Sequence, residues 1–298
     1  MIKHDSDDRL PVQMSSLLNQ DLHIFAFDHR SQMEAMADLA DVGHDRIGEF
    51  KQLCLEAVQL AESDIGTVGI LCDSKHGAEA LGVATDSDYW IGRPVELPGS
   101  RPLEFEPELG PQLDGLASWP KNHIVKVLCF YHPEDEVALK QQQESALVAL
   151  AKMAKAQNLE LLVEIIPSKC GPVSQSTTAE VIQRLYDIGI FPDWWKLEPL
   201  EDFESWRVTC DVVHQNDVGV KGIVVLGLDA PVDQLQQSFE IATQFDLVKG
   251  FAVGRTLFSK EASLWLSNTI SSQEAVMRMK DNFVSLSEIW DKCRQAAG

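Results

Sequence analysis

The chain has 298 residues, 45% of them apolar, and a formal net charge of −21 at pH 7. This length suits either two ordinary domains or one α/β barrel, and the apolar fraction can fill a sizeable core. The acidic balance excludes nucleic acid and an anionic membrane surface as partners, because phosphate groups are bound by clustered Lys and Arg. An anionic substrate would therefore need a local positive site in a negative protein.

The cysteines and the N-terminal segment predict the compartment. No apolar run approaches the roughly 20 residues of a membrane span, and MIKHDSDDRL at the N-terminus lacks the apolar segment of a signal peptide. We therefore predict a cytoplasmic protein in which the cysteines are small core residues in a reducing compartment. Six cysteines are scattered without a CxxC pair: Cys54, Cys72, Cys129, Cys170, Cys210 and Cys293.

Strand and helix patterns alternate along the chain after a polar leader or linker remnant at residues 1–20. Helices are predicted from Asp45, from Glu134 and Asp135, over residues 178–188, after the cap Asp202, and after Asp229–Ala230–Pro231. The last part of the chain is predicted to be helical to its end. Seven segments have the apolar character of strands: LHIFAFDHR (22–30), TVGILCDS (67–74), HIVKVLCFYHP (123–133), LELLVEIIPS (159–168), DWWKLEPL (193–200), GIVVLGLDA (222–230) and LVKGFAVGRTLF (247–258).

The segment WIGRPVELP (90–98) has β character despite its prolines and supplies the missing third strand, followed by an elaborated loop. Strictly alternating β and α units predict a parallel sheet. No GxGxxG follows the first strand, so the open dinucleotide-binding sheet is not supported. We therefore predict an α/β fold, a single-domain (β/α)8 TIM barrel over residues 21–298.

Three predicted strands are each interrupted by a charged residue: Lys126, Glu164 and Lys196. Burying an unpaired ammonium among apolar residues, as in DWWKLEPL, costs several kcal/mol. Because side chains alternate along a strand, all three groups can face the barrel interior and meet there. A lysine that is desolvated beside a second cation becomes a nucleophile near neutral pH.

Other charged residues and glycines follow the predicted strands, at the end where barrels carry their chemistry. Asp28 and Arg30 follow the first strand, where they could contact the substrate or form an ion network. Lys75 follows the second strand. The loops after the last two strands usually bind phosphate, which makes three residues there a candidate anion site: Gly227, Gly254 and Arg255.

Three alternatives stay open at this point. Lys196 could be a strand lysine paired with Glu198. The barrel could be non-catalytic and regulate or scaffold a sugar kinase. A metal-dependent aldolase could use four residues at strand ends, although their spacing fits no ligand signature: His29, Asp73, His76 and His132.

The segments FAFDHR, VKVLCFYHP, LVEII, WKLEP and VGRTLF resemble strand ends of class I tagatose-bisphosphate aldolases, barrels that form a Schiff base on a lysine of the sixth strand. From about residue 20 onward the chain is most similar to the aldolase-like module fused behind bacterial 5-dehydro-2-deoxygluconokinase of myo-inositol breakdown. FAFDHRSQ and WIGRPVELPGSRPL carry that closer resemblance.

The resemblance implies an imine at Lys196, proton transfer by Glu164 and assistance from Lys126. It also implies phosphate binding by Arg255 with Gly227 and Gly254. Asp28 matches the aspartate that contacts substrate in those enzymes. No metal or other cofactor is implied.

The sequence departs from the tagatose-type pattern in two places, His29 in place of glutamine and the added segment WIGRPVELPGSRPL. Both lie where the far end of the substrate would bind. The expected reaction is cleavage of 2-deoxy-5-keto-gluconate 6-phosphate to dihydroxyacetone phosphate and malonate semialdehyde. A carboxylate at the far end favours arginine, and the candidates are Arg30, Arg93 and Arg101. Cleavage of another phosphorylated ketose, fusion to or association with a sugar kinase, and a homo-oligomeric state all stay open.

Overall fold

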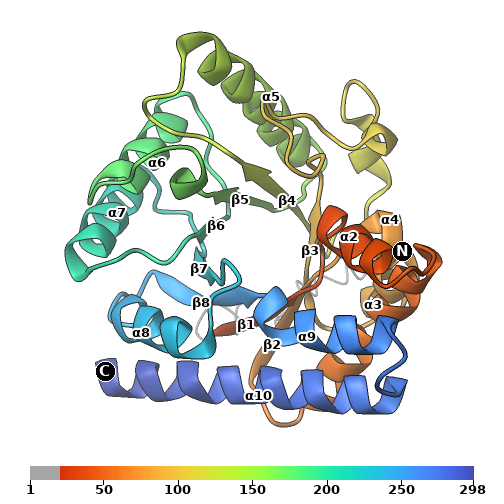
Figure 1. Cartoon of the computed structure of the whole chain (residues 1–298). Helices are drawn as coiled ribbons and strands as arrows, with labels where there is room; N and C mark the ends of the chain where they lie inside the picture. Colours follow the sequence, from red (N-terminus) through yellow and green to blue (C-terminus); the bar gives the residue numbers. More distant parts are fainter. Residues whose placement is uncertain (1–20) are drawn as a thin grey trace, which may run out of the picture.

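Residues 21–298 are described by the computed structural model, and they form a closed barrel of eight parallel strands in the order β1 to β8 (Figure 1). The predicted (β/α)8 fold is thus confirmed, including the strand in WIGRPVELP. The leader predicted for residues 1–20 lies outside the described residues. The strands are β1 Leu22–Ala26, β2 Thr67–Leu71, β3 Trp90–Pro94, β4 His123–Cys129, β5 Leu161–Ile165, β6 Trp194–Leu197, β7 Gly222–Leu226 and β8 Val248–Val253.

Helices surround the strands, and the longest, α10, packs across α3, α8 and α9 on the outside of the barrel (Figure 1). The described residues also include the short 3₁₀ turns η1 Pro107–Leu109, η2 Asp114–Ser118 and η3 Pro167–Lys169. The helices are α2 Ser31–Leu39, α3 Asp45–Ala61, α4 Ser74–Thr85, α5 Val137–Ala156, α6 Thr177–Asp187, α7 Phe203–Asn216, α8 Val232–Ala242, α9 Arg255–Leu266 and α10 Ser272–Ala297.

Several helix starts follow from capping residues. Asp202 accepts a hydrogen bond from the Ser205 backbone at the start of α7, as predicted. The predicted start of α5 at Glu134 is wrong, because the Asp135 carboxylate instead accepts a hydrogen bond from the His132 backbone in a turn and the helix begins at Val137. Pro231 stands at the N-cap of α8 and not inside its first turn.

Two apolar layers hold the barrel together. The larger layer lies between the strands and the helices, and a smaller one fills the barrel interior. The interior layer includes Ile124, Leu162 and Trp194, from β4, β5 and β6. Parallel strands buried on both faces are apolar almost throughout, which explains why LHIFA in β1 is wholly buried.

The barrel closes between β1 and β8, where glycines allow a close approach. A Cβ at Gly250 would lie 1.8 Å from the Leu22 carbonyl oxygen, and one at Gly254 would lie 2.1 Å from that of Ala26. No other residue type fits at either position without moving the backbone. We call this contact the β1–β8 seam.

Among residues 21–298, no helix has both the length and the apolar character that crossing a membrane requires.

Candidate active site at the carboxyl end of the barrel

The three charged residues predicted from the strands lie on the interior face of the barrel. Lys126, Glu164 and Lys196 each follow an interior apolar residue by two positions, and side chains two apart on a strand share a face. Glu164 is the direct register partner of Lys196 across β5 and β6. The charged groups therefore form a layer directly above the apolar interior layer.

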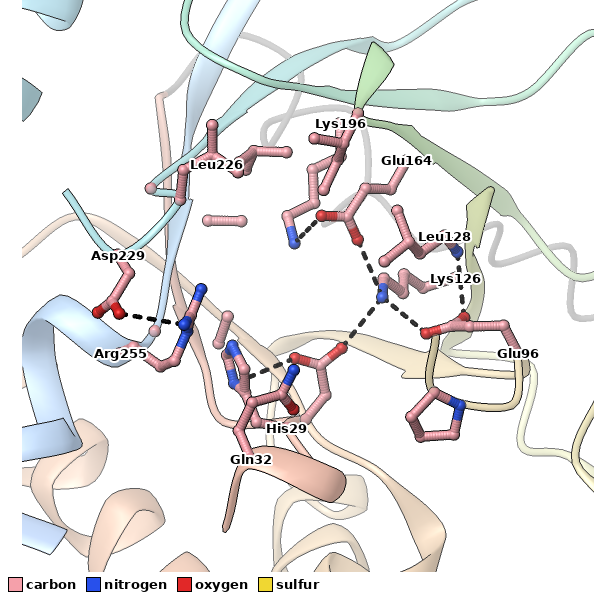
Figure 2. Close-up of a pocket in the computed structure, with 18 of the residues that line it drawn as sticks. His29, Gln32, Glu96, Lys126, Leu128, Glu164, Lys196, Leu226, Asp229 and Arg255 are labelled. Atoms are coloured by element: carbon pink, nitrogen blue, oxygen red, sulfur yellow. Dashed lines mark hydrogen bonds and ion pairs between the residues drawn. The ribbon is translucent and has the colours of Figure 1, made fainter. Parts of the chain in front are cut away.

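These side chains make a continuous chain of ion pairs that Figure 2 shows. The Lys196 ammonium lies 2.9 Å from Oε1 of Glu164, and the Lys126 ammonium lies 2.9 Å from Oε2 of the same carboxylate. Lys126 also contacts Glu96 at 3.0 Å and Asp28 at 3.3 Å. The two lysines are therefore bridged by Glu164, in place of the direct crowding of two cations expected from the sequence.

The surroundings give the two lysines different chemical capacities. Burial alone would lower the pKa of Lys126, but the carboxylates of Glu164, Glu96 and Asp28 raise it well above its ordinary value. Lys126 consequently stays a cation and is a poor nucleophile. Among residues 21–298, Lys196 pairs with a single carboxylate, that of Glu164, which can accept its proton. Lys196 is therefore the candidate for attack on a carbonyl.

The carboxylates in this layer are ionised. Burial would raise the pKa of Glu164, but Lys126 and Lys196 lower it below its ordinary value. The pKa of Asp28 is also well below its ordinary value, because Lys126, His29 and Lys196 outweigh burial. Both groups are therefore charged and can accept hydrogen bonds from a substrate, and the strongly lowered pKa makes Asp28 a weak base.

His29 lies between the two sides of the cavity, beside Asp28 (Figure 2). Burial lowers the pKa of His29 to about 4, with Arg255 and Lys196 acting in the same direction and Asp28 opposing them. The imidazole is therefore neutral at pH 7 and offers a hydrogen bond without a charge. Lys51, which is paired with the Asp73 carboxylate, donates to the His29 carbonyl oxygen at 3.0 Å and helps to fix this loop.

The residues predicted for the phosphate lie on the other side of the same cavity, which has a volume of about 330 Å³. Gly227, Gly254 and Arg255 line it, and Arg255 is the first residue of α9. The N-terminus of a helix carries unpaired N–H groups and a partial positive charge, which favour an anion. Arg255 lies 3.0 Å from Asp229 at a partly exposed site, so its guanidinium is available to a ligand.

The cations proposed to bind the substrate do not all reach the cavity. Lys75 is exposed and pairs with Glu34 at 2.8 Å. Arg93 stacks on Trp119, and Arg101 pairs with Asp135; neither lines the cavity.

Arg30 does line the cavity, but carboxylates already occupy part of its guanidinium. It pairs with Glu96 at 2.9 Å and Glu106 at 2.7 Å.

Two of the alternatives can be compared with these positions. Glu198 does not pair with Lys196; it accepts hydrogen bonds from the backbone and hydroxyl of Ser168. Of the four residues considered for a metal, the Asp73 carboxylate accepts a hydrogen bond from the His76 backbone at the start of α4. Residues 21–298 contain no group of three or more His, Cys, Asp or Glu placed to hold a metal ion.

Sequence reasoning missed several residues of the cavity. Glu96 is buried and bonds Arg30, Lys126 and the Leu128 backbone. The feature that could have identified Glu96 from the sequence is a carboxylate within the apolar run that follows β3. Lys169 and Asp229 also line the cavity, although neither was among the candidate site residues predicted from the sequence.

The fold and this cavity define a (β/α)8 barrel with a buried lysine–carboxylate network at its carboxyl end. The chain belongs to the family DUF2090, described as an uncharacterized protein conserved in bacteria, whose model matches residues 10–294. Among solved structures, Cgl0159 from Corynebacterium glutamicum is similar, with 18% identity, a TM-score of 0.58, and coverage of 90% of this chain and 85% of that one. This likeness extends to the fold alone. No curated protein matches the chain.

Proposed function

We propose that the protein is a class I aldolase, a carbon–carbon lyase that forms a Schiff base at Lys196. The observation that carries this proposal is the buried Lys196–Glu164 pair, 2.9 Å apart, in a cavity that also holds Arg255. A non-catalytic scaffold for a sugar kinase would have no use for this inward-facing set of charges. The proposal also agrees with the sequence resemblance to Schiff-base aldolases.

The first step is formation of the imine. Lys196 transfers a proton to Glu164, and the neutral amine attacks the ketone carbon of the substrate. Glu164 then returns the proton to the hydroxyl of the carbinolamine, which leaves as water and gives a protonated imine. The positive charge of the imine draws electrons from the neighbouring carbon–carbon bond.

The second step is cleavage. Glu164, again a carboxylate, accepts the proton of the hydroxyl two carbons from the ketone. The carbon–carbon bond breaks, its electron pair forms an enamine with the imine carbon, and the hydroxyl carbon leaves as an aldehyde. Lys126 remains a cation throughout and stabilises the oxygen of that hydroxyl as its charge develops. Protonation of the enamine and addition of water release the ketose phosphate and restore Lys196.

The proposed substrate is 2-deoxy-5-keto-gluconate 6-phosphate, cleaved to dihydroxyacetone phosphate and malonate semialdehyde in myo-inositol breakdown. Its ketone lies one carbon from the phosphate ester, so Lys196 and Arg255 would serve neighbouring groups. This assignment of the substrate rests mainly on the resemblance. It is supported by the N-terminus of α9, which lies in the same cavity as Lys196 and is suited to bind an anion.

The proposal is tested by assaying product formation from this keto acid phosphate beside tagatose and fructose bisphosphates. We expect a clear preference for the keto acid phosphate in kcat/KM. A preference for either bisphosphate would overturn the substrate while leaving Schiff-base cleavage in place. Absence of cleavage for all three, with a folded protein, would favour the non-catalytic scaffold.

Arg255→Ala is expected to raise KM by roughly 10- to 100-fold with a smaller change in kcat. One charge-assisted hydrogen bond is worth about 1.5–3 kcal/mol, and this one would bind the phosphate in ground state and transition state alike. Steady-state kinetics measure the effect. Arg278→Ala, in an exposed ion pair on α10, is the matched control. An unchanged KM in the Arg255 variant would assign the phosphate to another site.

A further inference from the structure

Lys169 differs from the other cations that line the cavity. Arg30, Lys126, Lys196 and Arg255 each have a carboxylate within 4.0 Å. Within the part of the chain that the structure describes, the Lys169 ammonium has no such ion pair. Burial raises the pKa of Glu198, and the Lys169 charge is near enough to oppose that rise. It therefore offers the cavity a positive charge that no protein carboxylate neutralises directly.

The position of Lys169 is fixed by the residues around it. Lys169 ends η3, the turn that follows β5, and the preceding residue, Ser168, is bonded to Glu198 through its backbone at 3.0 Å and through its hydroxyl. Glu198 stands two residues after Lys196. Lys196 and Lys169 are thus connected across β5 and β6 through the hydrogen bonds between Glu198 and Ser168.

The strand order sets the direction of a bound substrate. The anion site at Gly254 and Arg255 follows β8, the nucleophile Lys196 is on β6, and Lys169 follows β5. A substrate whose phosphate lies at the β8 end and whose ketone lies at Lys196 would extend its far end toward β5. Lys169 is at that rim of the cavity.

The opposite wall is unsuited to a second anion. Arg30 is bonded to Glu96 and Glu106, and Lys126 contacts Asp28, Glu96 and Glu164. These two cations thus face four carboxylates. A substrate carboxylate placed there would meet more negative than positive charge.

We infer that Lys169 binds the distal carboxylate of the substrate and makes the site selective for keto acid phosphates over ketoses with an uncharged far end. This inference rests on the proposed aldolase function. The lysine takes the place of the arginine expected from the sequence, and its exposure lets it reach the carboxylate of an aldehyde as it enters or leaves.

The test compares condensation of dihydroxyacetone phosphate with malonate semialdehyde and with propanal, which has the same carbon count and no charge. In Lys169→Met we expect kcat/KM for malonate semialdehyde to fall by roughly 10- to 100-fold, the effect of one charge-assisted hydrogen bond. The value for propanal should change by less than about threefold, and Lys169→Arg should keep most of the preference. Because Lys169 is exposed, added salt should reduce the preference in the wild type.

The controls separate this inference from the function on which it rests. Lys152→Met, an exposed lysine on α5 outside the cavity, should match the wild type with both aldehydes. An equal loss for both aldehydes in Lys169→Met, or no loss for either, would overturn the inference. If the wild type forms no borohydride-trapped adduct with dihydroxyacetone phosphate, the aldolase proposal itself fails. A trapped adduct together with an unchanged preference in Lys169→Met would reject the inference alone.

Discussion

Replacing Lys196 with methionine is expected to abolish cleavage, lowering kcat by several orders of magnitude, as when the covalent nucleophile of an enzyme is removed. Methionine fills similar space in the buried layer without an amine. Glu164 keeps its contact with Lys126 at 2.9 Å, so the carboxylate is not left without a cation and the barrel should still fold. Circular dichroism and thermal unfolding would check the fold of the variant.

Borohydride provides the direct measurement of the covalent step. In the wild type, reduction in the presence of dihydroxyacetone phosphate should inactivate the enzyme and attach the reduced adduct to Lys196, as located by peptide mass spectrometry. Lys196→Met should take up no adduct, whereas Lys152→Met should be labelled as the wild type is. Labelling of Lys126 in place of Lys196 would contradict the assignment, since Lys126 is held as a cation by three carboxylates. Activity that survives borohydride but is lost with a chelator would favour a metal-dependent aldolase.

Replacing Glu164 with glutamine is expected to slow turnover by at least ~10²-fold, the usual contribution of a general base. The imine is expected to form still, but more slowly, because solvent water must then take the Lys196 proton that Glu164 accepts in the wild type. Glutamine keeps the shape of the side chain, but only its carbonyl oxygen can accept a hydrogen bond, from Lys196 or from Lys126, and it cannot accept the substrate proton. Borohydride should therefore still attach dihydroxyacetone phosphate to Lys196. Single-turnover cleavage, measured beside trapping, separates the two steps.

The pH dependence gives a second measurement on Glu164. Although burial opposes it, Lys126 and Lys196 hold the Glu164 pKa below its ordinary value of 4.5, so the base form should persist through all pH values above that.

Glu164→Asp should recover part of the lost rate, since it restores a carboxylate that is one carbon shorter. Normal turnover in Glu164→Gln would make Glu164 a structural ion-pair partner and reject the proposed cleavage step.

The barrel could be predicted from alternation of apolar strands and amphipathic helices, but the element ends could not. The predicted strand 123–133 is too long. Strand β4 ends at Cys129, with its last pairing to β5, but apolar residues continue beyond that point and give no signal for the end. Helix α2 was missed since only Met33 and Ala37 of its nine residues are buried, which leaves almost no apolar period to detect.

The candidate site was predictable where strand geometry determines side-chain direction. Lys126, Glu164 and Lys196 interrupt apolar strands, so the period of two was enough to aim them inward. The long segment between β3 and β4 has no such period. The buried position of Glu96 and the position of Arg101 depend on how that segment folds back, including the bridge between Glu96 and Phe105, whereas Arg93 lies within β3 itself.

The β1–β8 seam has a consequence for how ligand and fold depend on each other. Gly254 makes the tight approach to Ala26 that closes the cylinder, and the next residue, Arg255, starts the helix whose terminus faces the proposed phosphate position. A phosphate held there, between the loop after β7 and the start of α9, would bind only the closed barrel. By mass action, a ligand that binds only the closed barrel raises the free energy of its unfolding. The substrate would therefore stabilise the barrel that cleaves it.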